Sequence, residues 1–210
     1  MDSSIYIIIA TILLFLFAIT IHEFSHGWIA YKCGDNTAMS MGRLTLNPLS
    51  HIDIFGTVIL PLLLLFSGLP PFGYAKPVPV NFGNLGNPKR DMIWVAIAGP
   101  ASNIVAAVAI ALILKVLHIS FSSVAGKVLF YGMVINLYLA IFNLFPIPPL
   151  DGSRVVTGLL PYRYAVPYNK IEPFGFLIIL GLFYFGILQR ILTPIVILFL
   201  KFMGFGNVMH

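Results

Sequence analysis

The chain has 210 residues, of which 59% are hydrophobic and only 9% are charged. Soluble domains of this size carry far more charge, so the composition indicates an integral membrane protein with most of its mass in the bilayer. The formal net charge of +5 comes from Lys and Arg residues scattered beside apolar segments, which is typical of topology signals and not of nucleic-acid binding. The single cysteine, Cys33, excludes an internal disulfide and a cysteine-rich metal site.

The first apolar run predicts a membrane helix over residues 4–30, and it contains the letters HEFSH at residues 22–26. His22 and His26 are four residues apart, so they share one helix face and can bind one metal ion. Glu23 lies close enough to act as a base toward a metal-bound water. The alternative is a chance match or a polar cluster between packed helices. No Lys or Arg precedes the run, so we interpret it as a retained span and not as a cleaved signal peptide.

A polar stretch follows, in which His51 and Asp53 lie close together. A turn whose polar side chains cap the next element is favoured there over direct metal ligation. Residues 54–69 are apolar but short, since sixteen helical residues span about 24 Å against a hydrocarbon core of about 30 Å. Residues 76–81, KPVPVN, fit neither a helix interior nor a central strand, and an extended edge segment is expected.

Two further spans are predicted over residues 91–116 and 125–143. The first opens with AGPASN, whose small residues are typical of close helix packing. Its Asn103 is either an interhelical contact, which the sequence favours, or a support for a metal ligand. The second span ends in NLFPIPPLDG, where three prolines stop the helix and a rigid turn presents Asp151. This carboxylate suits a metal ligand, and the alternative is an N-cap for a helix over residues 152–160.

Residues 174–203 are apolar again and predict either one long kinked helix or a tight hairpin, with the hairpin favoured. Two histidines leave a zinc site incomplete, so a third ligand is needed. The candidates in polar contexts are His51, Asp53, Asp91 and Asp151.

If Asp151 is the ligand, it must lie on the same side of the membrane as His22 and His26. That requires residues 54–69 to enter the membrane and return, because a crossing there would place Asp151 on the opposite side. The basic residues before the last apolar segment agree with this topology, since one side then holds eight of them and the other two. The eight are Lys32, Arg43, Lys76, Lys89, Arg90, Arg154, Arg163 and Lys170, and the two are Lys115 and Lys127.

Together HEFSH in an apolar helix, AGPASN in the next long helix and NLFPIPPLDG after the following span resemble the site-2 protease family of intramembrane zinc metalloproteases. The resemblance covers about residues 5–160 and is closest to compact bacterial and archaeal members without PDZ or CBS domains. It implies these roles: zinc ligands His22, His26 and Asp151, general base Glu23, and a substrate or oxyanion contact at Asn143. The GYAKPVPVNF stretch is similar to the family's re-entrant β segment beside the active site.

We therefore expect an all-α membrane protein, a polytopic transmembrane helix bundle of about four to five spans with a short re-entrant apolar segment and a small extended or β loop. Residues 1–210 are expected to form a single membrane-embedded protease domain, with its core at about 4–160 and a C-terminal helical segment or hairpin at 174–203.

The expected function is an intramembrane zinc metalloendopeptidase with one Zn²⁺ per chain, which hydrolyses peptide bonds within or near the transmembrane segments of membrane proteins. We expect it in the plasma membrane of a bacterium or archaeon, in contact with lipid, with its active site toward the cytoplasm. No nucleic-acid partner is expected, and a regulatory membrane partner is left open. In the extended segment Pro77 and Pro79 lack an N–H, so a substrate strand would pair with remaining groups such as those of Val78 and Val80.

Two alternatives remain. One is an ion transporter or channel that uses His and Glu as ion ligands, which predicts polar faces on several helices. The other is a membrane zinc protease whose third ligand is a Glu, for which only Glu172 is available besides Glu23.

Overall fold

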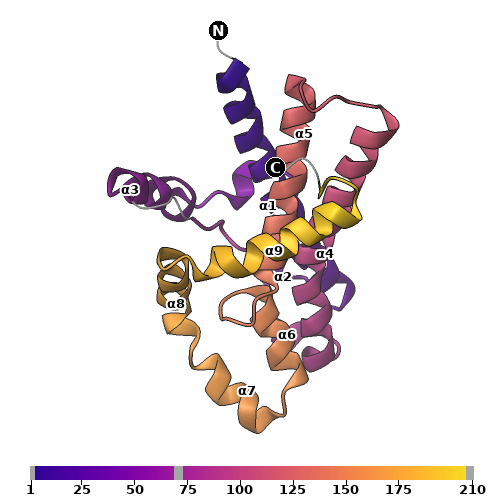
Figure 1. The fold of residues 1–210 in the computed structure, drawn as a ribbon. Coiled ribbons are helices and arrows are strands. Elements are labelled where there is room, and N and C mark those ends of the chain that lie inside the picture. The colour runs from indigo at the N-terminus through magenta and orange to yellow at the C-terminus, as the bar shows by residue number, and fades with distance from the viewer. Residues whose placement is uncertain (1–2, 69–72, 207–210) are drawn as a thin grey trace.

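The computed structural model describes residues 3–68 and 73–206, and it contains helices but no strand in those residues (Figure 1). The helices are α1 Ser3–Lys32, α2 Thr37–Ser40, α3 Leu60–Phe66, α4 Pro88–Val116, α5 Val124–Asn143, α6 Asp151–Leu159, α7 Tyr162–Asn169, α8 Glu172–Tyr184 and α9 Ile187–Phe202. Shorter helical turns are Pro48–His51, Ile54–Ile59 and Phe82–Asn84. The predicted all-α membrane fold is confirmed.

Three helices, α1, α4 and α5, are long and apolar enough to cross a membrane, and the bent pair α8 and α9 adds a fourth candidate. With the bent pair counted as one span, the structure has four candidate spans, which is the lower end of the predicted four to five. Helix α4 packs against α1, α5 and α6, while α9 crosses the bundle and packs on α5 (Figure 1). The largest buried cluster lies between α4, α5 and α9, and includes Ala107, Met133, Leu137 and Val196. This cluster holds the spans together.

The C-terminal region is two helices that meet at an angle of 76°, so the favoured hairpin is wrong. Gly186 has φ +68° at the junction, a left-handed conformation that glycine adopts without steric cost and that ends α8. Helix α9 then buries one stripe of residues at four-residue intervals: Leu188, Leu192, Val196 and Leu200. Packing of this stripe on the bundle decides the angle, because it directs α9 across the other helices and not back along α8.

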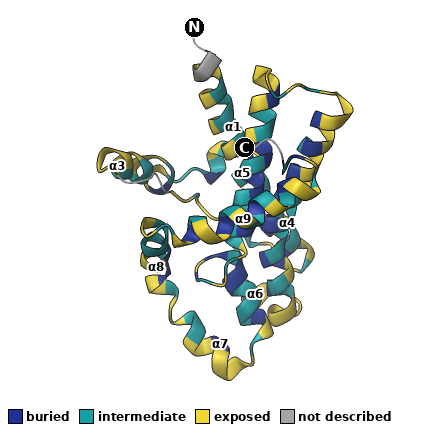
Figure 2. Ribbon diagram, in the orientation of Figure 1, coloured by how far each residue is buried: buried dark blue, intermediate teal, exposed yellow. Residues whose placement is uncertain are grey.

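The predicted re-entrant segment leaves the bundle and returns beside its own starting point. The Tyr74 N–H donates to the Gly56 carbonyl at 3.1 Å, and the Thr57 hydroxyl donates to the Tyr74 carbonyl at 2.9 Å. Helix α3 lies on the outgoing arm, stands away from the other helices and buries no residue (Figures 1 and 2). Residue 69, the last of the predicted segment, lies outside the described residues. The two arms meet at their base, as a re-entrant segment requires.

The turn that carries Asp151 packs tightly on its own chain and on α8. A Cβ at Gly152 would lie 2.1 Å from the Leu144 carbonyl oxygen, and a Cβ at Gly175 would lie 1.7 Å from that of Pro148. Any residue with a Cβ would clash with these backbone oxygens, so only glycine fits at either position. Two glycines on different helices therefore place the turn, and with it the start of α6.

Candidate metal centre

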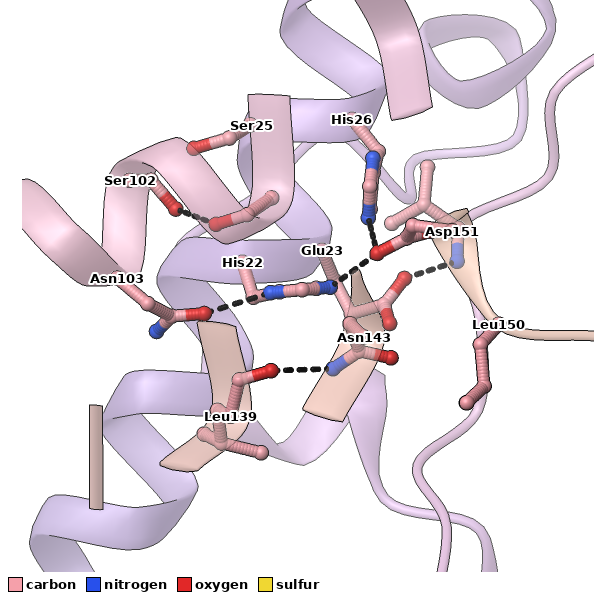
Figure 3. A network of polar contacts seen from close by, with 12 residues as sticks. His22, Glu23, Ser25, His26, Ser102, Asn103, Leu139, Asn143, Leu150 and Asp151 are labelled. Carbon is pink, nitrogen blue, oxygen red and sulfur yellow. Dashed lines mark hydrogen bonds and ion pairs between the residues drawn. The ribbon is translucent and has the colours of Figure 1, made fainter. Parts of the chain in front are cut away.

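Three side chains from two helices converge at the junction of α1, α4 and α6. His22 and His26 project from the same face of α1, with ring centroids 4.6 Å apart. Asp151 begins α6, and its Oδ2 lies 3.0 Å from Nε2 of His22 and 3.2 Å from Nε2 of His26 (Figure 3). The i and i+4 spacing of the histidines accounts for their shared face. Since both histidines are buried, the cluster needs a compensating partner.

Each histidine is oriented by an oxygen atom on α4. Nδ1 of His22 lies 2.6 Å from Oδ1 of Asn103, and Nδ1 of His26 lies 2.7 Å from the carbonyl oxygen of Val95. Both oxygens accept hydrogen bonds, so Nδ1 of each ring carries a proton. Nε2 of each ring faces the carboxylate of Asp151. An imidazole held in this way through its second nitrogen is the usual arrangement of a metal ligand.

Asn103 also joins three helices. Its Nδ2 donates to the Ala18 carbonyl on α1 at 3.0 Å and to Oδ1 of Asn136 on α5 at 2.8 Å, which leaves Oδ1 for His22. Asn136 in turn donates to the Gly132 carbonyl at 2.8 Å. The sequence analysis favoured an interhelical contact for Asn103, and the structure shows that Asn103 also contacts the candidate ligand His22. The sequence feature that could have indicated this second contact is a polar residue inside an apolar helix.

The donor set fits a divalent metal ion. Once Nε2 of each imidazole has lost its proton, two nitrogen lone pairs and one carboxylate oxygen repel one another unless a cation lies between them. Tetrahedral zinc with bonds of about 2.0–2.2 Å holds its ligands roughly 3.4 Å apart, and all three donor atoms here lie within 4.8 Å of one another. The two Nε2-to-Oδ2 distances are slightly shorter than that ideal, so only a small expansion is needed.

Gly99 keeps the space beside the donors open. A Cβ at this position would lie 2.4 Å from Nε2 of His26 and 2.6 Å from Nε2 of His22. Because both distances are close to metal–ligand bond lengths, a side chain here would compete with the ion for the same volume. The sequence interpretation assigned the AGPASN residues to helix packing, and it missed this requirement because the approach of α4 to the histidines is a tertiary contact.

Glu23 and Asn143 lie beside the three donors without joining them. Oε2 of Glu23 accepts a hydrogen bond from the Val78 N–H at 2.7 Å. Asn143 ends α5, and its Nδ2 donates to the Leu139 carbonyl of its own helix at 2.9 Å. Figure 3 shows Asn143 next to Glu23, with its amide group toward the site. One N–H of that amide is used by the helix, and the second remains available to a ligand.

Two of the other candidate ligands belong to turns, as the sequence favoured. His51 is 2% exposed, and its Nε2 lies 2.9 Å from the carbonyl oxygen of Thr45. Asp53 caps the helical turn Ile54–Ile59 by accepting from the Gly56 N–H at 2.7 Å. Neither belongs to the metal-binding group found among the described residues.

The remaining acidic candidates also have structural partners. Asp91 accepts from the backbone N–H of Asn87 at 2.7 Å at the start of α4, and Glu172 pairs with Arg154. Asp151 is not an N-cap, since Leu150 holds that position and the Asp151 side chain faces the histidines. The alternatives to Asp151 are therefore each accounted for elsewhere.

The extended segment at residues 73–81 lies against α1 without forming a strand. The guanidinium of Arg43 donates to the carbonyls of Lys76 and Pro77 at 3.0 and 3.1 Å. In the described chain four of its N–H groups are already hydrogen-bonded, namely those of Tyr74, Lys76, Val78 and Asn81. The Val78 N–H, one of the two donors expected to pair with a substrate strand, is thus bonded to Glu23 in this structure. The N–H groups of Gly73, Ala75 and Val80 have no partner among the described residues.

The far end of this segment is anchored by Asp35, which is fully buried in the loop after α1. Its carboxylate accepts from the Asn81 N–H at 2.8 Å, from Nδ2 of Asn84 at 3.0 Å and from the Thr37 N–H at 3.1 Å. Burial alone would raise the pKa of Asp35, but hydrogen bonds from Thr37, Asn84 and Asn81 outweigh burial and hold this pKa below its usual value. The anchor is therefore ionised at neutral pH.

The fold and the site together define an α-helical integral membrane protein with a cluster of two histidines and one aspartate that could hold a metal ion. The family comparison agrees: the model of peptidase family M50 matches residues 10–122 and 118–185. The chain belongs to this family, and the predicted membership of the site-2 protease family is confirmed.

Several curated proteins resemble the chain over most of its length. "Putative zinc metalloprotease YwhC" of Bacillus subtilis is 37% identical over 196 residues, which cover 90% of this chain and 84% of that protein. "Putative zinc metalloprotease Rip2" of Mycolicibacterium smegmatis is 30% identical over 91% of this chain and 73% of its own. "Zinc metalloprotease MJ0392" of Methanocaldococcus jannaschii is 24% identical over 98% of this chain, which spans 50% of that protein. No solved structure matches the chain.

Proposed function

We propose that this protein is a single-domain intramembrane zinc metalloendopeptidase. The observation that carries the proposal is the convergence of His22, His26 and Asp151 within 4.8 Å, with the carboxylate of Glu23 beside them and outside the ligand group. A base next to a metal centre, and not bound to the metal, is what hydrolysis requires. Membership of a peptidase family and the names of the relatives support the same chemistry.

Each site residue has a distinct task in this proposal. His22, His26 and Asp151 would hold one zinc ion, which acts as a Lewis acid and lowers the pKa of a bound water toward neutrality. Glu23 accepts a proton from the attacking water and later delivers it to the leaving amine. Asn143 donates its second amide N–H to the oxygen on which negative charge develops.

The substrate would be a transmembrane segment of another protein. A helix hides each carbonyl in its own hydrogen bonds, so the substrate must unwind before its peptide bond can be attacked. The extended segment at 73–81 would hold the unwound strand, and the N–H of Val80, which has no partner among the described residues, is a donor with which that strand could pair. Lipid surrounds the apolar helices, and a membrane partner that restrains the enzyme is compatible with this arrangement.

The proposed location is the plasma membrane, with the site toward the cytoplasm. With residues 54–69 re-entrant, the chain before the last apolar segment would have eight Lys and Arg residues on the side of the site and two on the other, which is the expected cytoplasmic bias. Cysteine labelling at positions 43, 76, 90 and 163 should report one common side, with position 120 on the other. Labelling of position 76 or 90 together with 120 would contradict this topology.

The function is tested by measuring zinc content and cleavage of single-span membrane substrates in parallel. Glu23→Gln removes the base but no ligand, so cleavage should fall by about 10²–10⁴-fold while zinc stays bound. Asp151→Asn removes a ligand, so both zinc and cleavage should be lost. A parent protein that holds zinc and cleaves no substrate, with zinc lost from Glu23→Gln, would favour the ion transporter instead.

A further inference from the structure

The carboxylate of Glu23 has one hydrogen-bond donor among the described residues, and that donor is a backbone group. The Val78 N–H reaches Oε2 of Glu23 at 2.7 Å from a segment 55 residues further along the chain. Val78 lies between Pro77 and Pro79, neither of which has an N–H. Across these three residues a single N–H therefore remains, and it points at Glu23.

Val78 is fixed against α1 by its side chain as well as by its N–H. It is 7% exposed, and its Cγ1 would lie 2.9 Å from a Cβ at Gly27, one helical turn after Glu23. Glycine at this position lets the segment approach the helix backbone closely. Helix α1 thus offers the segment two adjacent contacts, the Glu23 carboxylate and the bare surface at Gly27.

The segment is also held on both sides of Val78. Arg43 donates to the carbonyls of Lys76 and Pro77, and Asp35 accepts from the Asn81 N–H. The two prolines restrict φ near −65°, so the backbone between these anchors has little freedom. The N–H of Val78 is therefore pre-organised toward Glu23 and does not depend on a mobile side chain.

We propose that Val78 is a positioning residue for the base: its N–H holds Oε2 of Glu23 and leaves Oε1 as the oxygen that accepts the proton. The role of Glu23 as a base rests on the proposed function, whereas the hydrogen bond between Val78 and Glu23 does not depend on it. A carboxylate with one oxygen fixed presents the other in a defined direction, and catalytic groups lose about 100-fold in rate when misplaced by about 1 Å. The same segment would then hold the substrate and aim the base.

The first test concerns the contact alone and uses zinc-free protein in detergent micelles. With ¹⁵N-valine labelling, the Val78 amide proton should exchange with solvent slowly, and Glu23→Ala should speed its exchange by about ten-fold or more. The Val80 amide, which has no partner in the described chain, should exchange fast in both proteins. Equal exchange of the Val78 amide in parent and Glu23→Ala would overturn the contact whether or not the protein is a protease.

The second test concerns catalysis and compares two substitutions at one position. Val78→Pro removes the N–H, and kcat should fall by about 10–100-fold while KM and zinc content change little. Val78→Ala, the conservative variant, keeps the N–H and should recover at least about ten-fold in kcat relative to Val78→Pro. Equal kcat values for the two variants, or a loss confined to KM, would make Val78 a substrate contact and overturn its positioning role.

The two tests separate this inference from the proposed function. A parent protein without cleavage, in which the Val78 amide is still protected by Glu23, would reject the protease and keep the contact. An active parent in which Val78→Pro matches Val78→Ala would keep the protease and reject the positioning role.

Discussion

The metal centre and the extended segment at 73–81 are neighbours built in different ways. The centre uses side chains: two histidines on α1, Asp151 on α6 and orienting oxygens from α4. The segment is held through its backbone groups, which bind Arg43, Glu23 and Asp35. Because each metal ligand of the centre is one particular residue, loss of a ligand or of the space between the ligands should abolish function. The segment is held by several anchors, so the loss of one anchor should reduce function only partly.

The sharpest way to break the centre without touching a ligand is Gly99→Ala. The new Cβ would lie 2.4 and 2.6 Å from the two Nε2 atoms, so zinc occupancy and cleavage should both fall to background. Gly181→Ala is the matched control, since a Cβ there meets nothing within 4 Å. Metal analysis of the purified proteins is the measurement. Full zinc occupancy in Gly99→Ala would show that the donors do not share that space.

A smaller loss is expected when the orientation of a ligand is disturbed. Asn103→Leu removes the acceptor of His22 Nδ1, and zinc affinity should fall by about 10–100-fold. Thr20→Val is the control, because Thr20 is equally buried but bonds only the Leu16 carbonyl of its own helix. Competition with a chelator measures the affinity. Equal affinities for the two variants would reduce Asn103 to an interhelical contact.

A substitution in the support of the segment should spare the metal. Arg43→Gln removes the donor to the Lys76 and Pro77 carbonyls, so KM should rise by roughly three- to ten-fold with zinc content unchanged. Arg90→Gln, at an exposed arginine of α4, should leave KM unchanged. Steady-state cleavage and metal analysis together decide the outcome. A parallel loss of zinc would mean that the segment is a structural support of the centre.

The smallest effect concerns the far anchor and depends on pH. The folded state lowers the pKa of Asp35, so this group stabilises the fold above the ordinary carboxyl pKa of about 4 and loses that effect as pH falls through the folded-state value. Asp35→Asn should therefore lower the free energy of unfolding by about 1–2 kcal/mol near neutral pH, and by less in acid. Unfolding in micelles from pH 7 to pH 3 measures it. A difference that stays constant with pH would argue against an ionised anchor.

Local pattern alone determined much of this protein. The composition predicted an all-helical membrane protein, and the helical period predicted that His22 and His26 share a face. If Asp151 is the third ligand, the count of membrane crossings requires a re-entrant segment at 54–69. In the structure Asp151 lies 3.0 Å from His22, and the two arms of that segment meet at their base. These inferences succeeded because each rests on a regular repeat or on the thickness of the membrane, which act at every position along the chain.

Only the tertiary structure decided how the site is supported. The task of Asn103, the space at Gly99 and the hydrogen bond from Val78 to Glu23 all depend on how closely two distant segments approach. The bend at Gly186 likewise follows from where α9 finds its buried surface. Asparagines, glycines and backbone N–H groups occur in many helices and turns, and their local sequence does not show which of them have a functional role. Their function here arises from packing register between α1, α4 and the extended segment, and no local repeat encodes that register.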